Sequence, residues 1–93
     1  MKLSQAEITE RMKTAHGWAL EQDAIKKQFT FKGFPAAVDF VSRLVPEAEA
    51  ADHHPDIQIN YKRVTLVYST HSEGGLTEKD FAGAAMADRI AAR

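Results

Sequence analysis

The sequence contains no cysteine, and it contains no long run of apolar residues. Without cysteine the chain can form no disulfide, no thiol nucleophile and no thiolate metal site. Because its apolar runs are only a few residues long, it has no predicted membrane span. The first residues, MKLSQAEITERMK, also lack the apolar stretch of a signal peptide. We therefore expect a soluble cytoplasmic protein.

An excess of charge of one sign is missing as well. The 12 Lys and Arg side chains nearly balance the 13 Asp and Glu side chains, which leaves a net charge of −1. Nucleic-acid binding would need a basic patch or stripe, so nucleic acid is not an expected partner. The composition, 44% hydrophobic and 27% charged, is that of a globular protein. Its 93 residues predict a single domain, residues 1–93, with one modest core.

Two helix starts are marked by capping boxes. Ser4 with Glu7 forms the first box, and Thr77 with Asp80 forms the second. The first box predicts a helix that ends near Gly17, since glycine commonly follows the last helical residue. The second predicts a helix through EKDFAGAAMADRIAA, in which small residues allow close packing.

A third helix is predicted between these two. Apolar residues from Ala37 to Ala48 recur at helical spacing, and Pro35 suits a first helical position. Pro46 interrupts this pattern, because an interior proline costs about 3 kcal/mol and kinks a helix. Since the EAEAA segment that follows still has a helical composition, we expect the helix to bend at Pro46 and continue.

The remaining segments alternate apolar and polar residues with a period of two, which predicts four strands. They fall near residues 18–20, 25–31, 57–61 and 64–68, with His71 close to the end of the last strand. Strands joined by short turns pair antiparallel. The predicted order is αββαββα, and the predicted fold is an α+β domain in which three helices cover one face of a four-stranded antiparallel sheet.

The four histidines are the candidate functional residues. His16 falls in the last turn of the first predicted helix, where a capping or surface role is expected. His53 and His54 occupy the loop before Pro55, and His71 ends a strand, which are places where proteins display functional groups.

Residue types and spacing leave three interpretations of the last three histidines open. A metal site is disfavoured, because neighbouring side chains in an extended segment point to opposite sides and His53 and His54 would converge poorly on one ion. Acid–base chemistry is a second interpretation. Imidazole has a pKa of about 6.5, so one histidine can donate a proton while another accepts one, as the elimination of water requires. A surface role without chemistry is the third.

The stretch EAEAADHHPDIQINYKRVTLVYSTHSEGGLTEKD, residues 47–80, resembles the pterin-4a-carbinolamine dehydratases. The family pattern has a charged residue, three others, His-His-Pro, an aromatic residue, a further His and then Asp. In this chain these elements are Glu49, His53, His54, Pro55, Tyr61, His71 and Asp80. Some members carry an aromatic residue two positions after the proline, where this chain has Ile57. The predicted order of helices and strands matches the family fold over nearly the whole chain.

The resemblance implies an enzyme, a hydro-lyase that converts 4a-hydroxytetrahydropterin to quinonoid dihydropterin and water. This step recycles the pterin cofactor of aromatic amino-acid hydroxylases. His53 and His71 are the implied acid–base residues. The residues implied to bind or orient the substrate are His54, Pro55, Asp80 and Glu49. The resemblance implies no metal and no redox cofactor, and its implied partners are the pterin, further copies of the chain in a homodimer or homotetramer, and a hydroxylase.

Structural roles compete with these functional ones. Asp80 is also the N3 residue of the Thr77 capping box. Glu49 suits a solvated helix face, and Tyr61 suits strand packing or the core. The same family includes dimerisation cofactors of a homeodomain transcription factor and assembly factors of a carbon-fixing enzyme. A non-catalytic protein-binding role is therefore the alternative function. The three clustered histidines favour the enzyme, since a scaffold has no need to keep them together.

Overall fold

The computed structural model describes all 93 residues, and its elements follow the order predicted from the sequence. A single 3₁₀ turn, η1, is added between the last strand and the last helix. The elements are α1 (Gln5–Met12), β1 (Ala19–Glu21), β2 (Ala24–Thr30), α2 (Phe34–Ala51), β3 (Asp56–Asn60), β4 (Arg63–Tyr68), η1 (His71–Glu73) and α3 (Glu78–Ala91).

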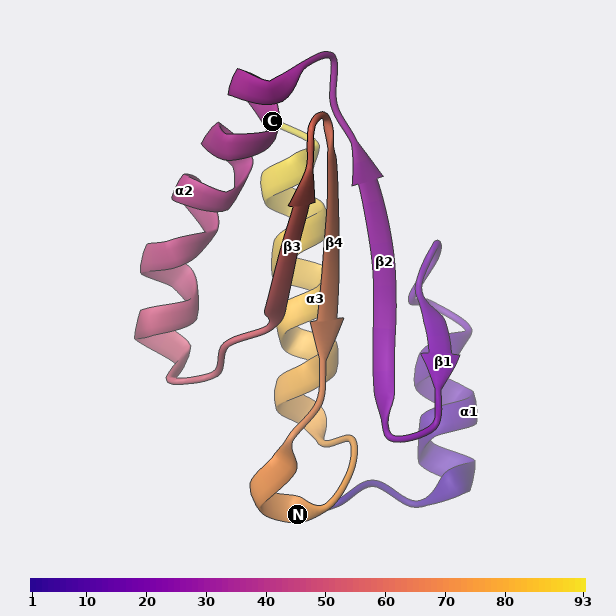
Figure 1. Cartoon of the computed structure of the whole chain (residues 1–93). Helices are drawn as coiled ribbons and strands as arrows, with labels where there is room; N and C mark the ends of the chain where they lie inside the picture. Colours follow the sequence, from indigo (N-terminus) through magenta and orange to yellow (C-terminus); the bar gives the residue numbers. More distant parts are fainter.

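The four strands form one antiparallel sheet in the order β1-β2-β4-β3. The helices lie on one side of this sheet, and the other side is open (Figure 1). Helices α2 and α3 contact each other and the inner strand β4. The predicted α+β fold is therefore confirmed. None of the helices is long and apolar enough to cross a membrane.

The hydrophobic core lies between the sheet and the helices. Ile25 and Phe29 of β2 are paired with Tyr68 and Val64 of β4, so that all four side chains point toward the helices. The buried residues that complete the core are Leu3, Ile8, Trp18, Ala37, Phe40, Leu44, Leu66, Leu76, Ala84, Ala87 and Ile90. Small side chains on α3 let this helix approach the sheet closely, as the sequence predicted.

Helix α2 runs without interruption from Phe34 to Ala51, with Pro46 inside it. The continuation beyond Pro46 that we expected is confirmed. Pro46 lies on the exposed side of the helix, so the carbonyl oxygen that its missing N–H leaves free can be hydrated.

Helix α1 is shorter than predicted. It ends at Met12. The N–H groups of Thr14 and Ala15 then donate to carbonyl oxygens three residues earlier, as in turns, and Gly17 takes a positive φ of 85°. His16 therefore lies in a turn rather than in the last turn of a helix. Thr, His and Gly are weak helix formers, and the chain must turn here to bring Trp18 into the core.

The prediction that Tyr61 packs in a strand or in the core is wrong. Tyr61 follows β3 in a two-residue hairpin turn, with a positive φ of 55°, and its exposed fraction is 67%. The favoured two-residue hairpin turns have a positive φ at their first residue, and Tyr61 occupies that position. The neighbouring strand β3 is an edge strand, which leaves Ile57 and Ile59 exposed although they face the helix side, opposite Leu66 and Val64.

Candidate functional site

The loop that carries His53 and His54 is fixed at both ends. Helix α2 terminates at Asp52 in left-handed backbone, with φ 51° and ψ 43°. The His53 N–H then donates to the carbonyl oxygen of Ala48, a bond typical of helix ends that reverse direction. Pro55, at the other end, is buried. The two histidines are thus presented by a short, well-anchored segment between α2 and β3.

His53 points inward and pairs with Asp80 at the start of α3. The distance from His53 Nε2 to Asp80 Oδ1 is 2.6 Å. The side chain of His53 is 12% exposed and that of Asp80 is fully buried. A carboxylate oxygen accepts hydrogen bonds, so Nε2 of His53 carries the hydrogen of this bond. The pairing fixes both the orientation of the imidazole and its protonated nitrogen.

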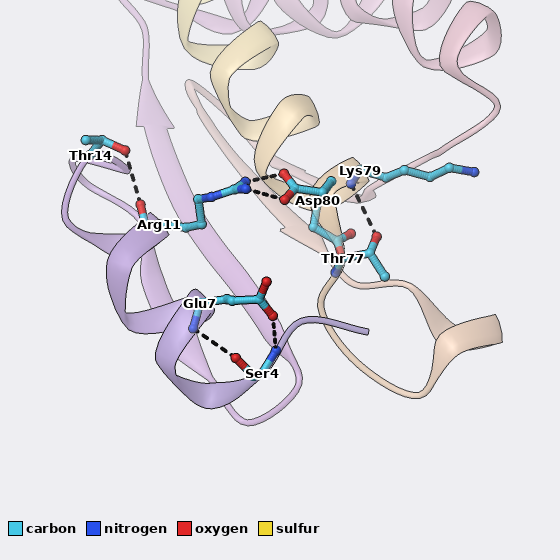
Figure 2. A network of polar contacts seen from close by, with 8 residues as sticks. Ser4, Glu7, Arg11, Thr14, Thr77, Lys79 and Asp80 are labelled. Atoms are coloured by element: carbon cyan, nitrogen blue, oxygen red, sulfur yellow. Dashed lines mark hydrogen bonds and ion pairs between the residues drawn. The ribbon is translucent and has the colours of Figure 1, made fainter. Parts of the chain in front are cut away.

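Asp80 serves the helix and the histidine together. Its other oxygen, Oδ2, accepts bonds from the Thr77 N–H at 3.0 Å and from the Thr70 hydroxyl at 2.8 Å. The bond from Thr77 belongs to the capping box that the sequence predicted. Figure 2 shows another bond of this cap, from the Lys79 N–H to the Thr77 hydroxyl. The capping bond and the contact with His53 therefore exist together, because each uses a different oxygen of Asp80.

His54 points away from His53. Its Nε2 lies 2.6 Å from Oε2 of Glu49, which is in the last turn of α2, and both side chains are more than half exposed. Each of the adjacent histidines therefore has its own carboxylate partner, on opposite sides of the loop. No group of three His, Asp or Glu side chains is placed to hold a metal ion.

His71 lies in η1, not at the end of β4 as we expected, and it is exposed. β4 ends at Tyr68, because the following residues turn away to make the bridge between Thr70 and Gly75. His71 shares a cavity of about 350 Å³ with His54. Three acidic residues, Glu21, Asp23 and Asp56, also line this cavity.

His53 does not line the cavity of His54 and His71. It lines a second cavity of about 250 Å³, between the end of α2 and the face of α3, together with Lys79 and Arg89. The structure therefore brings the predicted site residues into two groups, His53 with Asp80 and His54 with Glu49 and His71. Pro55 anchors the loop between them and lines neither cavity.

Two residues at this site were missed by the sequence analysis. The Thr70 hydroxyl bonds to Asp80, and the ring of Tyr68 stacks on His53, with centroids 6.0 Å apart and an angle of 25° between the planes. Burial, helped by the negative charge of Asp80, raises the pKa of Tyr68 to about 12. Nothing in the local pattern distinguishes Tyr68 from any other inward-facing strand residue.

The start of α3 is also tied to α1. Both terminal guanidinium nitrogens of Arg11 bond to the carboxylate of Glu78, and the Ser4 capping box lies close by (Figure 2). The bond from Glu78 raises the pKa of Arg11, and the bond from the Ser4 N–H lowers the pKa of Glu7. The position of α3, and with it Asp80, is therefore supported from the N-terminal helix.

Comparison with known proteins supplies the family. Residues 1–90 match the family model described as pterin 4 alpha carbinolamine dehydratase. The chain belongs to this family. A family member from Chloroflexus aurantiacus, which carries a pterin-4-alpha-carbinolamine dehydratase name, is 52% identical over 89 residues and aligns over 96% of both chains. One from Sulfolobus acidocaldarius, with the same name, is 51% identical over 87% of this chain and 89% of its own.

Solved structures of the dehydratase family and its relatives have the same fold. The crystal structure of a transcriptional coactivator/pterin dehydratase from Brucella melitensis superposes with a TM-score of 0.94 at 35% identity, over 98% of this chain and 99% of that one. A pterin dehydratase-like protein described as a RuBisCO assembly factor in the alpha-carboxysome superposes with a TM-score of 0.69 at 24% identity, over 82% of this chain and 90% of its own. The second similarity shows the fold alone.

Proposed function

We propose that this protein is a dehydratase that converts 4a-hydroxytetrahydropterin to quinonoid dihydropterin and water. The observation that carries the proposal is the 2.6 Å contact between His53 and the buried carboxylate of Asp80. A buried carboxylate holds an imidazole in one tautomer and stabilises the imidazolium that forms when the ring takes up a proton. This is the arrangement expected of a general acid–base residue, and it occurs in a protein of the dehydratase family.

The reaction requires two proton transfers and no change of oxidation state. The C4a–O bond breaks as the hydroxyl receives a proton and leaves as water, and N5 gives up its proton as the C4a–N5 double bond forms. Because Nε2 of His53 bonds to Asp80, Nδ1 is the nitrogen of this ring that exchanges a proton with the substrate. His71 is the second acid–base residue in our proposal.

The cavity of His54 and His71 is the site we propose for the pterin ring. Its volume of about 350 Å³ falls within the usual range of small-molecule pockets, roughly 300–1,000 Å³. His54, oriented by Glu49, binds the pterin there. His53 lines the neighbouring cavity and not this one, so our proposal requires the pterin to span the loop of residues 53–55 and reach Nδ1 of His53. Turnover recycles the pterin that an aromatic amino-acid hydroxylase has used.

A direct assay on 4a-hydroxytetrahydropterin tests the proposal. The wild-type protein is expected to accelerate dehydration, and His53→Ala to lose the general acid–base contribution, roughly 10²–10⁴-fold in kcat. His71→Ala lowers kcat as well, whereas His54→Ala mainly raises KM. His16→Ala, in a turn outside both cavities, is the matched control and leaves both constants unchanged. Normal turnover by His53→Ala would refute the assignment.

A protein-binding role is the second candidate. Exposed apolar side chains favour it, namely Phe34, Val38 and Val45 on α2 and Ile57 and Ile59 on β3. Such surfaces mark protein contacts when they are contiguous, and an exposed edge strand adds unpaired backbone groups. A protein whose sole role is to bind a partner would show no dehydratase activity, and its partner binding would survive His53→Ala. The same assay therefore separates the two functions.

A further inference from the structure

Tyr68 is the largest completely buried side chain of the core. Its ring lies between two others, with Trp18 at 5.9 Å and His53 at 6.0 Å between centroids. The contact with His53 is nearly parallel, at 25°, whereas the contact with Trp18 is tilted at 52°. The His53 imidazole therefore lies beside an aromatic ring, nearly parallel to it, that is itself held by the core.

Gly83 on α3 makes this placement of Tyr68 possible. A Cβ atom at position 83 would lie 2.5 Å from Cε1 and 2.8 Å from Cζ of Tyr68, closer than carbon atoms approach without displacement. The phenol ring thus occupies the space that a side chain at position 83 would need. Since α3 also carries Asp80, the same helix fixes both the partner of His53 and the aromatic ring beside it.

The hydroxyl of Tyr68 does not explain this arrangement. It is buried and has no hydrogen-bond partner in the chain, and such a group destabilises a fold by roughly 1–3 kcal/mol. Its raised pKa of about 12 keeps the phenol neutral, so it places no charge beside His53. The charged groups around His53 are Asp80, which it bonds, and Lys79 and Arg89, which line the same cavity. The part of Tyr68 that can affect His53 is therefore its aromatic ring.

We infer that Tyr68 is a positioning residue for His53, whose ring holds the imidazole in the orientation that places Nε2 on Asp80. The inference rests on the proposed function for its kinetic consequence, but its structural consequence can be measured without substrate. Loss of the ring leaves the imidazole free to rotate away from Asp80, although every group that His53 bonds is still present.

The test uses three variants of the full chain and two measurements besides activity. Tyr68→Phe keeps the ring and removes the hydroxyl. Tyr68→Leu removes the ring. The double variant Tyr68→Leu/Gly83→Ala adds a methyl group in the space that the ring vacates, and alanine also favours the helix over glycine. Thermal unfolding reports the packing, and the nitrogen NMR resonances of the His53 imidazole report its tautomer and its bond to Asp80.

Tyr68→Phe is expected to keep the His53 resonances and kcat of the wild type. In Tyr68→Leu the two ring nitrogens of His53 shift toward the averaged values of a mobile imidazole, and kcat falls roughly tenfold with KM unchanged, as expected for a misplaced reacting group. The double variant recovers thermal stability relative to Tyr68→Leu but recovers neither the resonances nor kcat. If Tyr68 only filled space in the core, the His53 resonances and kcat would both recover together with the thermal stability.

Two results overturn the inference. Unchanged His53 resonances in Tyr68→Leu would show that the ring does not hold the imidazole. Recovery of the resonances in the double variant would show that filled space, not an aromatic ring, is what matters. Absence of dehydratase activity in the wild-type protein would instead refute the proposed function, and it would leave the NMR result standing.

Discussion

Asp80 illustrates how one side chain can serve two purposes, since its Oδ2 caps α3 and its Oδ1 holds His53. Replacement of Asp80 by Asn keeps the shape but presents an amide donor to Nε2 of His53. The imidazole should then adopt the opposite tautomer, with its hydrogen on Nδ1. We expect kcat to fall at least tenfold, as measured in the dehydratase assay, with the tautomer change visible by nitrogen NMR.

Glu49→Gln is the matched control for this substitution. It makes the same chemical change at the other histidine–carboxylate pair, which is exposed and therefore weakly coupled. We expect a change in kcat of less than about threefold and a modest rise in KM. Equal losses of kcat in the two variants would contradict the greater importance of the buried pair.

Tyr68 predicts a specific response of stability to alkaline pH. Its pKa is raised from the ordinary value of 10.0 to about 12 in the folded state, so folding favours the neutral phenol. The contribution of Tyr68 to the free energy of unfolding is therefore fully present below pH 10 and is lost as the pH rises toward 12. Urea unfolding of wild type and Tyr68→Phe across this range should show the phenylalanine variant gaining relative stability.

At neutral pH the same substitution removes a buried hydroxyl that has no partner. Tyr68→Phe should therefore melt higher than wild type, by a few degrees, since about 1 kcal/mol shifts the melting temperature of a domain this size by roughly 4–8 °C. A lower melting temperature would show that the hydroxyl makes a stabilising bond, for instance to a buried water.

At the scale of elements, the two helix starts allow a direct comparison. Ser4 and Thr77 both cap a helix, but Ser4 is exposed whereas the Thr77 hydroxyl also contacts Thr70 at 2.9 Å in a buried network. Ser4→Ala should lower the free energy of unfolding by about 1 kcal/mol, and Thr77→Ala by roughly 2 kcal/mol. Chemical denaturation measures both. Equal losses would mean that the buried contact contributes nothing.

At the scale of the whole molecule, the exposed edge strand β3 and the apolar face of α2 lead us to predict self-association. Light scattering at micromolar concentration should give a mass at least twice the 10.3 kDa of one chain. Ile59→Lys, on the helix side of β3, should reduce this mass, and Gln58→Lys, on the opposite side of the same strand, should not. A monomeric wild-type protein would contradict the prediction.

We also predict that the site works without a metal ion. Because His53 and His54 diverge to separate carboxylates, and proton transfer is sufficient for the reaction, dialysis against a strong chelator should leave the dehydration rate unchanged. A large loss of rate that zinc restores would contradict the proposed chemistry.

Features of this protein that depend on residues close together in the chain could be predicted from the sequence alone. Both capping boxes, the order of helices and strands and the continuation of α2 through Pro46 all follow from patterns a few residues long. The divergence of His53 and His54 also follows, because adjacent extended residues point to opposite sides. Local sterics and local hydrogen bonds are sufficient to fix these features.

Contacts between residues far apart in the chain could not be predicted in this way, because they form only when the whole chain packs. His53 and Asp80 are 27 positions apart, and Arg11 and Glu78 are 67 apart, so no local pattern predicts either pair. The ring of Tyr68 reaches His53 because Gly83 leaves room on another element, and His71 enters a turn because Thr70 bridges to Gly75. Such contacts depend on which surfaces the chain packs together, and that is set by the core as a whole.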